Sequence, residues 1–252
     1  MLDATQRFST RVDDYVKYRP GYPDAAFDEL TRRVRARLPL CAADIGSGTG
    51  IFSRGLLERG FTVHAVEPNR EMRQAAEASI TDSRFSSHDA RAEATGLRDH
   101  SVSAVFAAQA FHWFDAPACR SEWARILQPG GLVGLIWNER KLGSPFMDAY
   151  EAALSEGNPE YAKVTHRQLD GSAIGRFFAP VPFEKLEYDN AQSFDWEGLQ
   201  GRALSSSYVP RPGEPGHADF VARLKRLYDQ HQSAGEVRFE YVTAVYVGKL
   251  EI

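Results

Sequence analysis

Three glycines at alternate positions, Gly46, Gly48 and Gly50, follow a short apolar run that ends in Asp44. Glycine lets the backbone come close to a ligand and adopts conformations that other residues resist. Residues 51–60 then have helical spacing, so the glycines occupy a strand-to-helix turn, where the free N–H groups of a helix N-terminus can face a ligand. The turn therefore predicts a cradle for a nucleotide-type cofactor.

Three interpretations of this turn compete. A bare Gly-x-Gly turn needs no ligand. A nicotinamide or flavin dinucleotide site has the pattern G-x-G-x-x-G, but here Ile51 stands at the position of the last glycine. The third interpretation is S-adenosylmethionine, whose turn is commonly G-x-G-x-G. Glu67, at the end of the second predicted strand, can accept hydrogen bonds from both ribose hydroxyls, but the same geometry serves NAD.

The segments that position these residues alternate between strand and helix. Apolar or β-branched runs predict strands at 41–45, 61–66, 84–88, 103–109 and 132–137, and helical spacing predicts helices at 50–59, 70–79 and 116–127. Such alternation predicts right-handed βαβ units in an α/β fold with a doubly wound, mostly parallel sheet. Two later segments, 183–189 and 237–247, predict closing strands, the last of them antiparallel, which gives a sheet of seven strands.

The length of 252 residues suits one large domain, so we predict a single domain over residues 1–252. Its predicted parts are N-terminal cap helices at 1–38, a cofactor-binding core at 41–137, acceptor-side insertions at 139–182 and 193–232, and the closing strands.

The composition argues against several classes of protein. The formal net charge is -4, so no overall basic field draws the chain to nucleic acid or to an anionic membrane. Cys41 and Cys119 lie far apart and match neither a disulfide framework nor a metal-ligand spacing. The N-terminus lacks the apolar run of a secretion signal, and no run is long enough to span a bilayer. We expect a cytoplasmic protein without a metal.

Four segments in succession resemble the motifs of class I S-adenosylmethionine-dependent methyltransferases. They are Ala43–Gly50, Val66–Asn69, Asp89-Ala90 and Gln128–Gly131. Two further segments, Gln109–Asp115 and Tyr18–Pro23, are similar to the small-molecule branch that includes trans-aconitate methyltransferase. The resemblance implies S-adenosylmethionine as the cofactor and S-adenosylhomocysteine as its product.

The resemblance also implies which residues contact the methionine half of the cofactor. Asp44 would lie near the methionine amino group, and Gln109, at the end of the central strand, would lie beneath the methionine end. Gly46, Ser47 and Gly48 would let the backbone approach the methionine and the ribose.

The remaining implied contacts lie around the ribose and the adenine. Glu67 would bind the ribose hydroxyls, and Pro68 and Asn69 would flank the adenine. Asp89 would reach the adenine amino group, while the backbone N–H of Ala90 would donate to the ring. All of these positions follow parallel strands at their carboxyl ends, where open α/β sheets bind ligands.

Aromatic residues near the central strand are candidates for the acceptor side. We hypothesise that Trp113, Tyr18 or Tyr22 walls the sulfonium pocket with an aromatic face, and that His112 orients or deprotonates the acceptor. The competing interpretations are core packing for Trp113 and a purely structural role for His112.

Arginines are candidates for binding a carboxylate on the acceptor, since the guanidinium forks onto two oxygens. Arg19, Arg202 and Arg211 are candidates for this clamp, with ordinary surface positions as the alternative. Nucleic-acid amino-methyltransferases usually carry Asn/Asp-Pro-Pro-aromatic after the central strand. The segment Gln109–His112 does not match it, which disfavours a DNA or RNA acceptor.

The sequence thus predicts an S-adenosylmethionine-dependent methyltransferase that acts on a small molecule, with a carboxylate as one candidate acceptor. Two other hypotheses stay open. One is an NAD(P)-dependent oxidoreductase, and the other is a protein that binds S-adenosylmethionine without catalysis.

Overall fold

A computed structural model describes residues 17–35, 39–156, 161, 171–206 and 208–251. The predicted cap helices at 1–38 are described in part: helix α2, Asp24–Arg35, buries Phe27, Leu30 and Val34 along one face. Residues 1–16 and 36–38 of that prediction lie outside the described residues.

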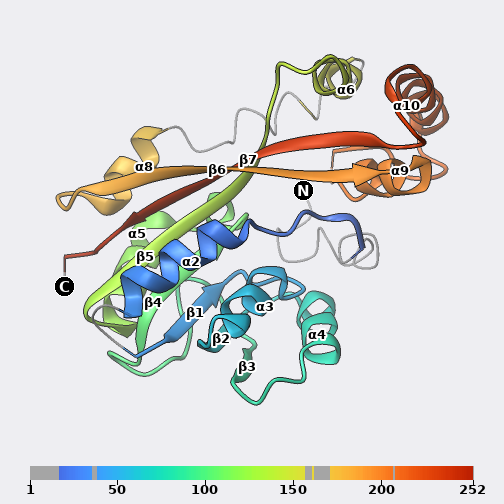
Figure 1. Ribbon diagram of the computed structural model, residues 1–252. Helices are drawn as coiled ribbons and strands as arrows, with labels where there is room; N and C mark the ends of the chain where they lie inside the picture. Colours follow the sequence, from blue (N-terminus) through green and yellow to red (C-terminus); the bar gives the residue numbers. More distant parts are fainter. Residues whose placement is uncertain (1–16, 36–38, 157–160, 162–170, 207, 252) are drawn as a thin grey trace.

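The predicted seven-stranded sheet is confirmed (Figure 1). The strands lie side by side in the order β3-β2-β1-β4-β5-β7-β6. Strands β1 to β5 pair in parallel, and β7 runs antiparallel to both of its neighbours. The strands are β1 Cys41–Ile45, β2 Thr62–Val66, β3 Phe85–His88, β4 Val102–Ala108, β5 Leu127–Arg140, β6 Phe183–Phe194 and β7 Val237–Gly248.

Strand β5 is longer than the sequence predicts at both ends. It begins at Leu127, which pairs with Val102, and the ladder then skips to Leu132, which pairs with Ala104. The intervening residues 128–131 contain a proline and two glycines, which disfavour regular pairing. At its other end β5 continues to Arg140 because β7 supplies a partner up to Tyr241.

Helices cover both faces of the sheet and the ends of its longest strands. In addition to α2 they are α3 Ile51–Glu58, α4 Arg70–Ser79, α5 Ala116–Ile126, α6 Pro145–Ser155, α8 Gly171–Phe178, α9 Trp196–Leu204 and α10 His217–His231, with a short 3-10 helix η3 at Phe111–Trp113. Two of them, α9 and α10, lie between β6 and β7 in sequence, so these antiparallel strands are not joined by a tight turn.

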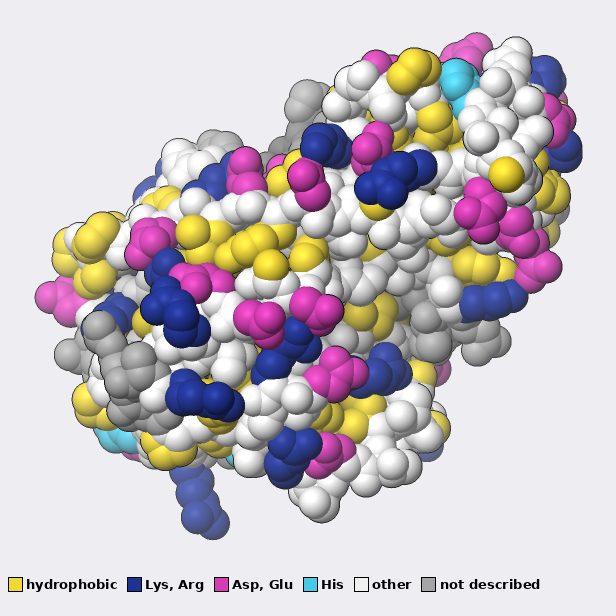
Figure 2. Space-filling view, viewed as in Figure 1, with side chains coloured by type: hydrophobic (Ala, Val, Ile, Leu, Met, Phe, Trp, Pro, Cys, Tyr) yellow, Lys and Arg dark blue, Asp and Glu magenta, His cyan; other side chains and the backbone are white. Residues whose placement is uncertain are grey.

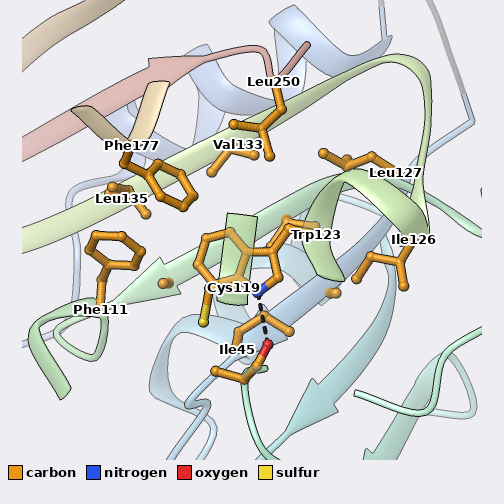
Figure 3. Packing of buried hydrophobic residues seen from close by; sticks show 14 of the residues in the cluster. Ile45, Phe111, Cys119, Trp123, Ile126, Leu127, Val133, Leu135, Phe177 and Leu250 are labelled. Atoms are coloured by element: carbon orange, nitrogen blue, oxygen red, sulfur yellow. Dashed lines mark hydrogen bonds between the residues drawn. The ribbon is translucent and has the colours of Figure 1, made fainter. Parts of the chain in front are cut away.

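Two hydrophobic clusters fix the layers of the core. On one face, α2 and α3 pack against the sheet through residues such as Phe27 and Leu56. On the other face, Trp123 of α5 is fully buried against Phe111 and Phe177. Its indole N–H donates to the carbonyl of Ala92 at 3.1 Å, so the buried polar atom is satisfied (Figure 3).

A third cluster lies where β5, β6 and β7 extend beyond the parallel strands, next to α6, α9 and α10 (Figure 1). Its residues include Tyr150, Leu199, Leu224 and Phe239. The sheet therefore has two parts. The parallel half consists of β1 to β4, and the helical half consists of the far ends of β5 to β7. Among the helices described, none is long and apolar enough to cross a membrane.

Candidate active site

The glycine turn between β1 and α3 has the left-handed backbone that its residues permit. Gly46, Gly48 and Gly50 have φ values of 68°, 57° and 79°. The N–H groups of Gly46 and Ser47 donate to the carbonyl of Val66 at 2.8 and 3.2 Å, which ties the turn to the end of β2. Added Cβ atoms would clash at Gly46 and Gly50, but at Gly48 nothing lies within 4 Å. The backbone of Gly48 therefore faces open space.

Asp44 is buried at the end of β1 with one oxygen left for a ligand. Its Oδ2 accepts from Ser53 Oγ at 2.6 Å, while Oδ1 is buried and has no hydrogen-bond partner among the described residues. Burial, with a smaller effect from the charge of Glu67, raises the pKa of the Asp44 carboxyl to about 7 despite the Ser53 hydrogen bond. A cationic donor placed at Oδ1 would satisfy this atom and favour the ionised form.

Glu67 directly follows β2, and its carboxylate holds the glycine turn in place. Its carboxylate accepts from the N–H of Gly48 at 2.9 Å and from the N–H of Asn69 at 2.8 Å. Burial raises its pKa above the usual range, against the effect of these two backbone hydrogen bonds. A carboxylate has about four lone-pair positions, so Glu67 retains capacity for hydroxyl donors.

The residues predicted to surround the adenine have contacts of their own in the structure. Asn69 caps helix α4, accepting from the N–H of Met72 at 2.9 Å. Asp89 is exposed and pairs with Arg73 at 2.8 Å. The N–H of Ala90, predicted to donate to the ring, donates here to the carbonyl of His88 at 3.1 Å. Pro68, between Glu67 and Asn69, is half-buried.

Gln109 follows β4 with a φ of 58°, an uncommon conformation for a residue other than glycine. Its N–H donates to the carbonyl of Ile136 at 2.8 Å, and its side-chain Nε2 donates to the carbonyl of Asn138 at 3.1 Å. Backbone strain of this kind gathers at functional sites, where surrounding contacts hold it. The strained residue stands at the predicted methionine end.

One cavity of about 440 Å³ joins the cofactor side to the acceptor side. Ten of the residues singled out from the sequence for the site line it, namely Arg19, Tyr22, Asp44, Gly46, Ser47, Gly48, Gln109, His112, Trp113 and Arg202. The other seven do not: Tyr18, Glu67, Pro68, Asn69, Asp89, Ala90 and Arg211. Ligand sites commonly have volumes of roughly 300–1,000 Å³, so the cavity has the size of a small-molecule site.

His112 is half-buried and lines this cavity as a neutral ring. Burial lowers its pKa to about 4. The indole N–H of Trp137 donates to His112 Nδ1 at 3.4 Å. Because an indole nitrogen is only a donor, Nδ1 must be the acceptor, and the proton of the neutral ring is on Nε2.

Residues 17–22 cross from α2 to the helical half, and Tyr18 anchors them there. Its ring packs so closely on α9 that a Cβ added at Gly201 would lie 2.0 Å from it. The Tyr18 hydroxyl donates to Glu197 at 3.2 Å. Next along the chain, Arg19 lines the cavity and donates to the carbonyl of Ser205 at 3.0 Å. Tyr18 thus positions its neighbour and does not itself line the cavity.

Arginines and tyrosines line the acceptor side, and sequence reasoning identified only part of this set. Arg202, one of the proposed clamp residues, lines the cavity, whereas Arg211 does not. The residues that were missed include Thr49, Trp137, Asn138, Arg140, Glu151, Tyr161 and Tyr208. For Trp137 and Asn138 a signal existed, because the strand predicted at 132–137 ends there, and ligands bind at the carboxyl ends of parallel strands in such sheets.

The site fits the cofactor implied by the sequence. Gly48 leaves room where a Cβ would stand, Asp44 offers an unpartnered oxygen to an ammonium group, and Glu67 keeps capacity for ribose hydroxyls. These three features favour a cofactor that carries a cationic amino acid end and a ribose.

Comparisons with known proteins agree with this geometry. Residues 43–135 match the model of a methyltransferase domain family. An uncharacterized methyltransferase from Mycobacterium tuberculosis is 39% identical over 138 residues, which cover 55% of this chain and 54% of that one. The chain thus spans about half the length of this relative. An uncharacterized methyltransferase from Schizosaccharomyces pombe is 30% identical over 250 residues, 95% of either chain.

The fold has a solved counterpart as well. A structure described as a type II methyltransferase from Anaeromyxobacter dehalogenans is similar with a TM-score of 0.70 and 25% identity, over 93% of this chain and all of that one. The full-length relative, the matched domain and the shared fold point to one family. The chain belongs to the class I S-adenosylmethionine-dependent methyltransferases.

Proposed function

We propose that this protein transfers a methyl group from S-adenosylmethionine to a small molecule that carries a carboxylate. The observation that carries the proposal is the single cavity that holds both the glycine turn and two arginines, Arg19 and Arg202. A guanidinium fork matches the two oxygens of a carboxylate.

Methyl transfer depends mainly on the alignment of the nucleophile, the methyl group and the sulfur atom. S-adenosylmethionine supplies a methyl group that is already activated on a sulfonium, and proximity and orientation lower such barriers by roughly 7–11 kcal/mol. In this chain Asp44 and Gln109 would fix the methionine end, and Trp113 and Tyr22 would contribute aromatic faces on the acceptor side. A base is needed only where the methylated atom must lose a proton.

His112 is better suited to orient the acceptor than to deprotonate it. With the proton on Nε2 and a pKa of about 4, the ring at neutral pH offers a donor to an acceptor oxygen. His112→Ala is expected to lower kcat/KM by about tenfold through this lost hydrogen bond, on the order of 1.4 kcal/mol. If the bond only orients, His112→Asn should recover part of the loss. A rate that vanishes in both variants would favour the base.

The test of the proposed function begins with the cofactor. We expect S-adenosylhomocysteine to raise the melting temperature of the purified protein and NADH to leave it unchanged; the opposite result would favour the oxidoreductase. Acceptor screening with small carboxylates, read as S-adenosylhomocysteine release, then tests turnover. A protein that binds S-adenosylhomocysteine but methylates nothing in a broad acceptor screen would fit the non-catalytic alternative.

Cofactor affinity should depend on pH through Asp44. The raised pKa of about 7 means that the carboxyl is mostly protonated at pH 6 and mostly ionised at pH 8. Only the ionised form pairs with an ammonium group, so S-adenosylhomocysteine should bind about tenfold more tightly at pH 8 than at pH 6. Isothermal titration calorimetry at both values measures this. Asp44→Asn should bind more weakly at pH 8 and lose the pH dependence.

The other predictions from sequence are carried forward in the same proposal. On the face shown in Figure 2, the basic and acidic side chains of the described residues are interspersed, so this face offers nucleic acid no continuous basic surface. A cytoplasmic location, a single domain and membership of the branch that includes trans-aconitate methyltransferase remain predictions.

A further inference from the structure

Arg202 is a buried cation that faces the cavity and has no acidic partner among the residues that the structure describes. It is 4% exposed and lines the cavity. Its Nε donates to the Tyr241 hydroxyl at 2.8 Å and its Nη1 to Ser206 Oγ at 3.3 Å. The guanidinium also lies over the rings of Phe239 and Tyr241, at 5.2 and 5.7 Å from their centres. Among the described residues, no carboxylate comes within 4.0 Å of it.

This arrangement differs from that of the neighbouring Arg140. Arg140 also lines the cavity, but Glu151 accepts from its Nε at 3.0 Å and balances its charge. A guanidinium stays protonated under all ordinary conditions, and a buried charge without a counter-charge is costly. Among the described residues, the positive charge of Arg202 therefore has no negative counter-charge, whereas Glu151 balances the charge of Arg140.

The surroundings confirm that this end of the cavity is electropositive. Tyr208 lines the cavity and its hydroxyl accepts from Arg140 Nη1 at 3.0 Å. Burial alone would raise the pKa of Tyr208, but Arg140, Arg202, a hydrogen bond with Ser206, and the charge of Arg19 together lower it below the usual range. Arg202 and Arg19 thus add positive charge at this phenol beyond the Arg140–Glu151 pair, and such a field attracts an anion.

The electropositive end is remote from the glycine turn. The glycine turn lies against Ala110, because a Cβ added at Gly46 would meet the Ala110 side chain. Ala110 follows β4, whose last residue, Ala108, pairs with Ile136 of β5. Arg140 follows four residues later and pairs with Tyr241, the residue that holds Arg202. Four strand residues span about 13 Å. This backbone spacing favours a position for a group bound at Arg202 that is away from the methionine end of the cofactor site.

We propose that Arg202, assisted by Arg19, binds an oxyanion of the acceptor, either a carboxylate or a phosphate, and that this group is not the one that is methylated. The inference rests on the proposed function and adds to it: the acceptor carries two groups, an anionic one held at Arg202 and a nucleophile nearer His112. The oxyanion fixes position and supplies binding energy, while its distance from the cofactor site keeps it out of the reaction.

The test uses the full chain saturated with S-adenosylhomocysteine, with glutarate and inorganic phosphate as probes at constant ionic strength. Binding is measured by calorimetry and by the rise in melting temperature. The variants are Arg202→Met, which removes the charge, Arg202→Lys, which keeps the charge without the fork, and Arg211→Gln as a control outside the cavity. We expect at least one probe to bind wild type and Arg211→Gln equally.

In Arg202→Met we expect about 30-fold or greater weakening of probe binding, with the affinity for S-adenosylhomocysteine within about twofold of wild type. Since the substitution removes an uncompensated charge, its melting temperature without ligands should match or exceed that of wild type. Arg202→Lys should bind the probes more weakly than wild type but measurably. If Arg202→Met fails to fold, the probe affinity of Arg202→Lys tests the anion site in its place.

The outcomes separate the possible ligands. Response to phosphate alone identifies a phosphate-bearing acceptor, and response to glutarate alone identifies a carboxylate. If S-adenosylhomocysteine binds but neither probe does, or if Arg202→Met binds the probes as wild type does, the anion site is disproved. Absence of S-adenosylhomocysteine binding would instead defeat the proposed function.

Discussion

Alanine at position 48 is expected to weaken S-adenosylhomocysteine binding by about 100-fold or more while the protein stays folded. Gly48 lines the cavity, and a Cβ there would meet no protein atom within 4 Å. The added methyl would therefore stand in the space predicted for the cofactor, where close backbone approach is required. Because φ is 57°, left-handed strain costs about 1–2 kcal/mol of stability. Calorimetry and thermal unfolding measure the two effects.

Gly96 offers a matched control for this prediction. Its φ is 71°, an added Cβ would also meet nothing within 4 Å, and it does not line the cavity. Gly96→Ala should therefore lose similar stability and keep its affinity for S-adenosylhomocysteine. If the two variants bind it equally well, the turn is not the cofactor cradle. Gly46→Ala should be the least stable of the three, since its Cβ would lie 2.6 Å from Ala110 Cβ.

Gly201→Ala is expected to detach the segment 17–22 from helix α9. The new Cβ would lie 2.0 Å from the Tyr18 ring, so the ring has to leave its place in the third cluster. Overpacking of this kind costs about 1–3 kcal/mol, which for a chain of this size lowers the melting temperature by roughly 2–4 °C for each kcal/mol. Arg19 follows Tyr18 directly, so acceptor binding should weaken along with stability.

A control and a double variant make this prediction specific. Gly175 lies in helix α8 with nothing within 4 Å of an added Cβ, so Gly175→Ala should be neutral or stabilising by up to about 1 kcal/mol. Combining Gly201→Ala with Tyr18→Ala should destabilise by less than the sum of the single changes, because both act on one contact. Additive effects would show that Tyr18 does not pack on Gly201.

The cofactor side could be predicted because its residues are local in sequence. Gly46 and Glu67 directly follow apolar strands and Gly48 lies in the turn that Gly46 begins, and parallel strands bring their carboxyl ends to one edge of the sheet. The structure places the glycine turn, Asp44 and Gln109 around one cavity. It also shows Glu67 supporting the turn through Gly48 N–H, a contact that strand order alone does not define.

The acceptor side could be predicted only in part because it is assembled from distant segments. Arg140 meets Glu151 of the next helix, α6, and also Tyr208, which lies 68 residues further along the chain. A single arginine or tyrosine in a helix has no periodic signal that separates a lining position from a surface position. Arg140 was missed for a further reason: the sequence predicted that its strand ends at 137, before β7 extends the pairing.

The long strands β5, β6 and β7 also bear on how a ligand reaches the cavity. They run without interruption from the parallel half into the helical half, joined by paired backbones over twelve positions between β6 and β7. A hinge between the halves would have to bend this continuous ladder, which close packing resists. The segment 17–22 has no such ladder and is held by a few side-chain contacts. We therefore expect the two halves to keep a fixed relative orientation, and access to the cavity to depend on segment 17–22 instead of on a hinge between the halves.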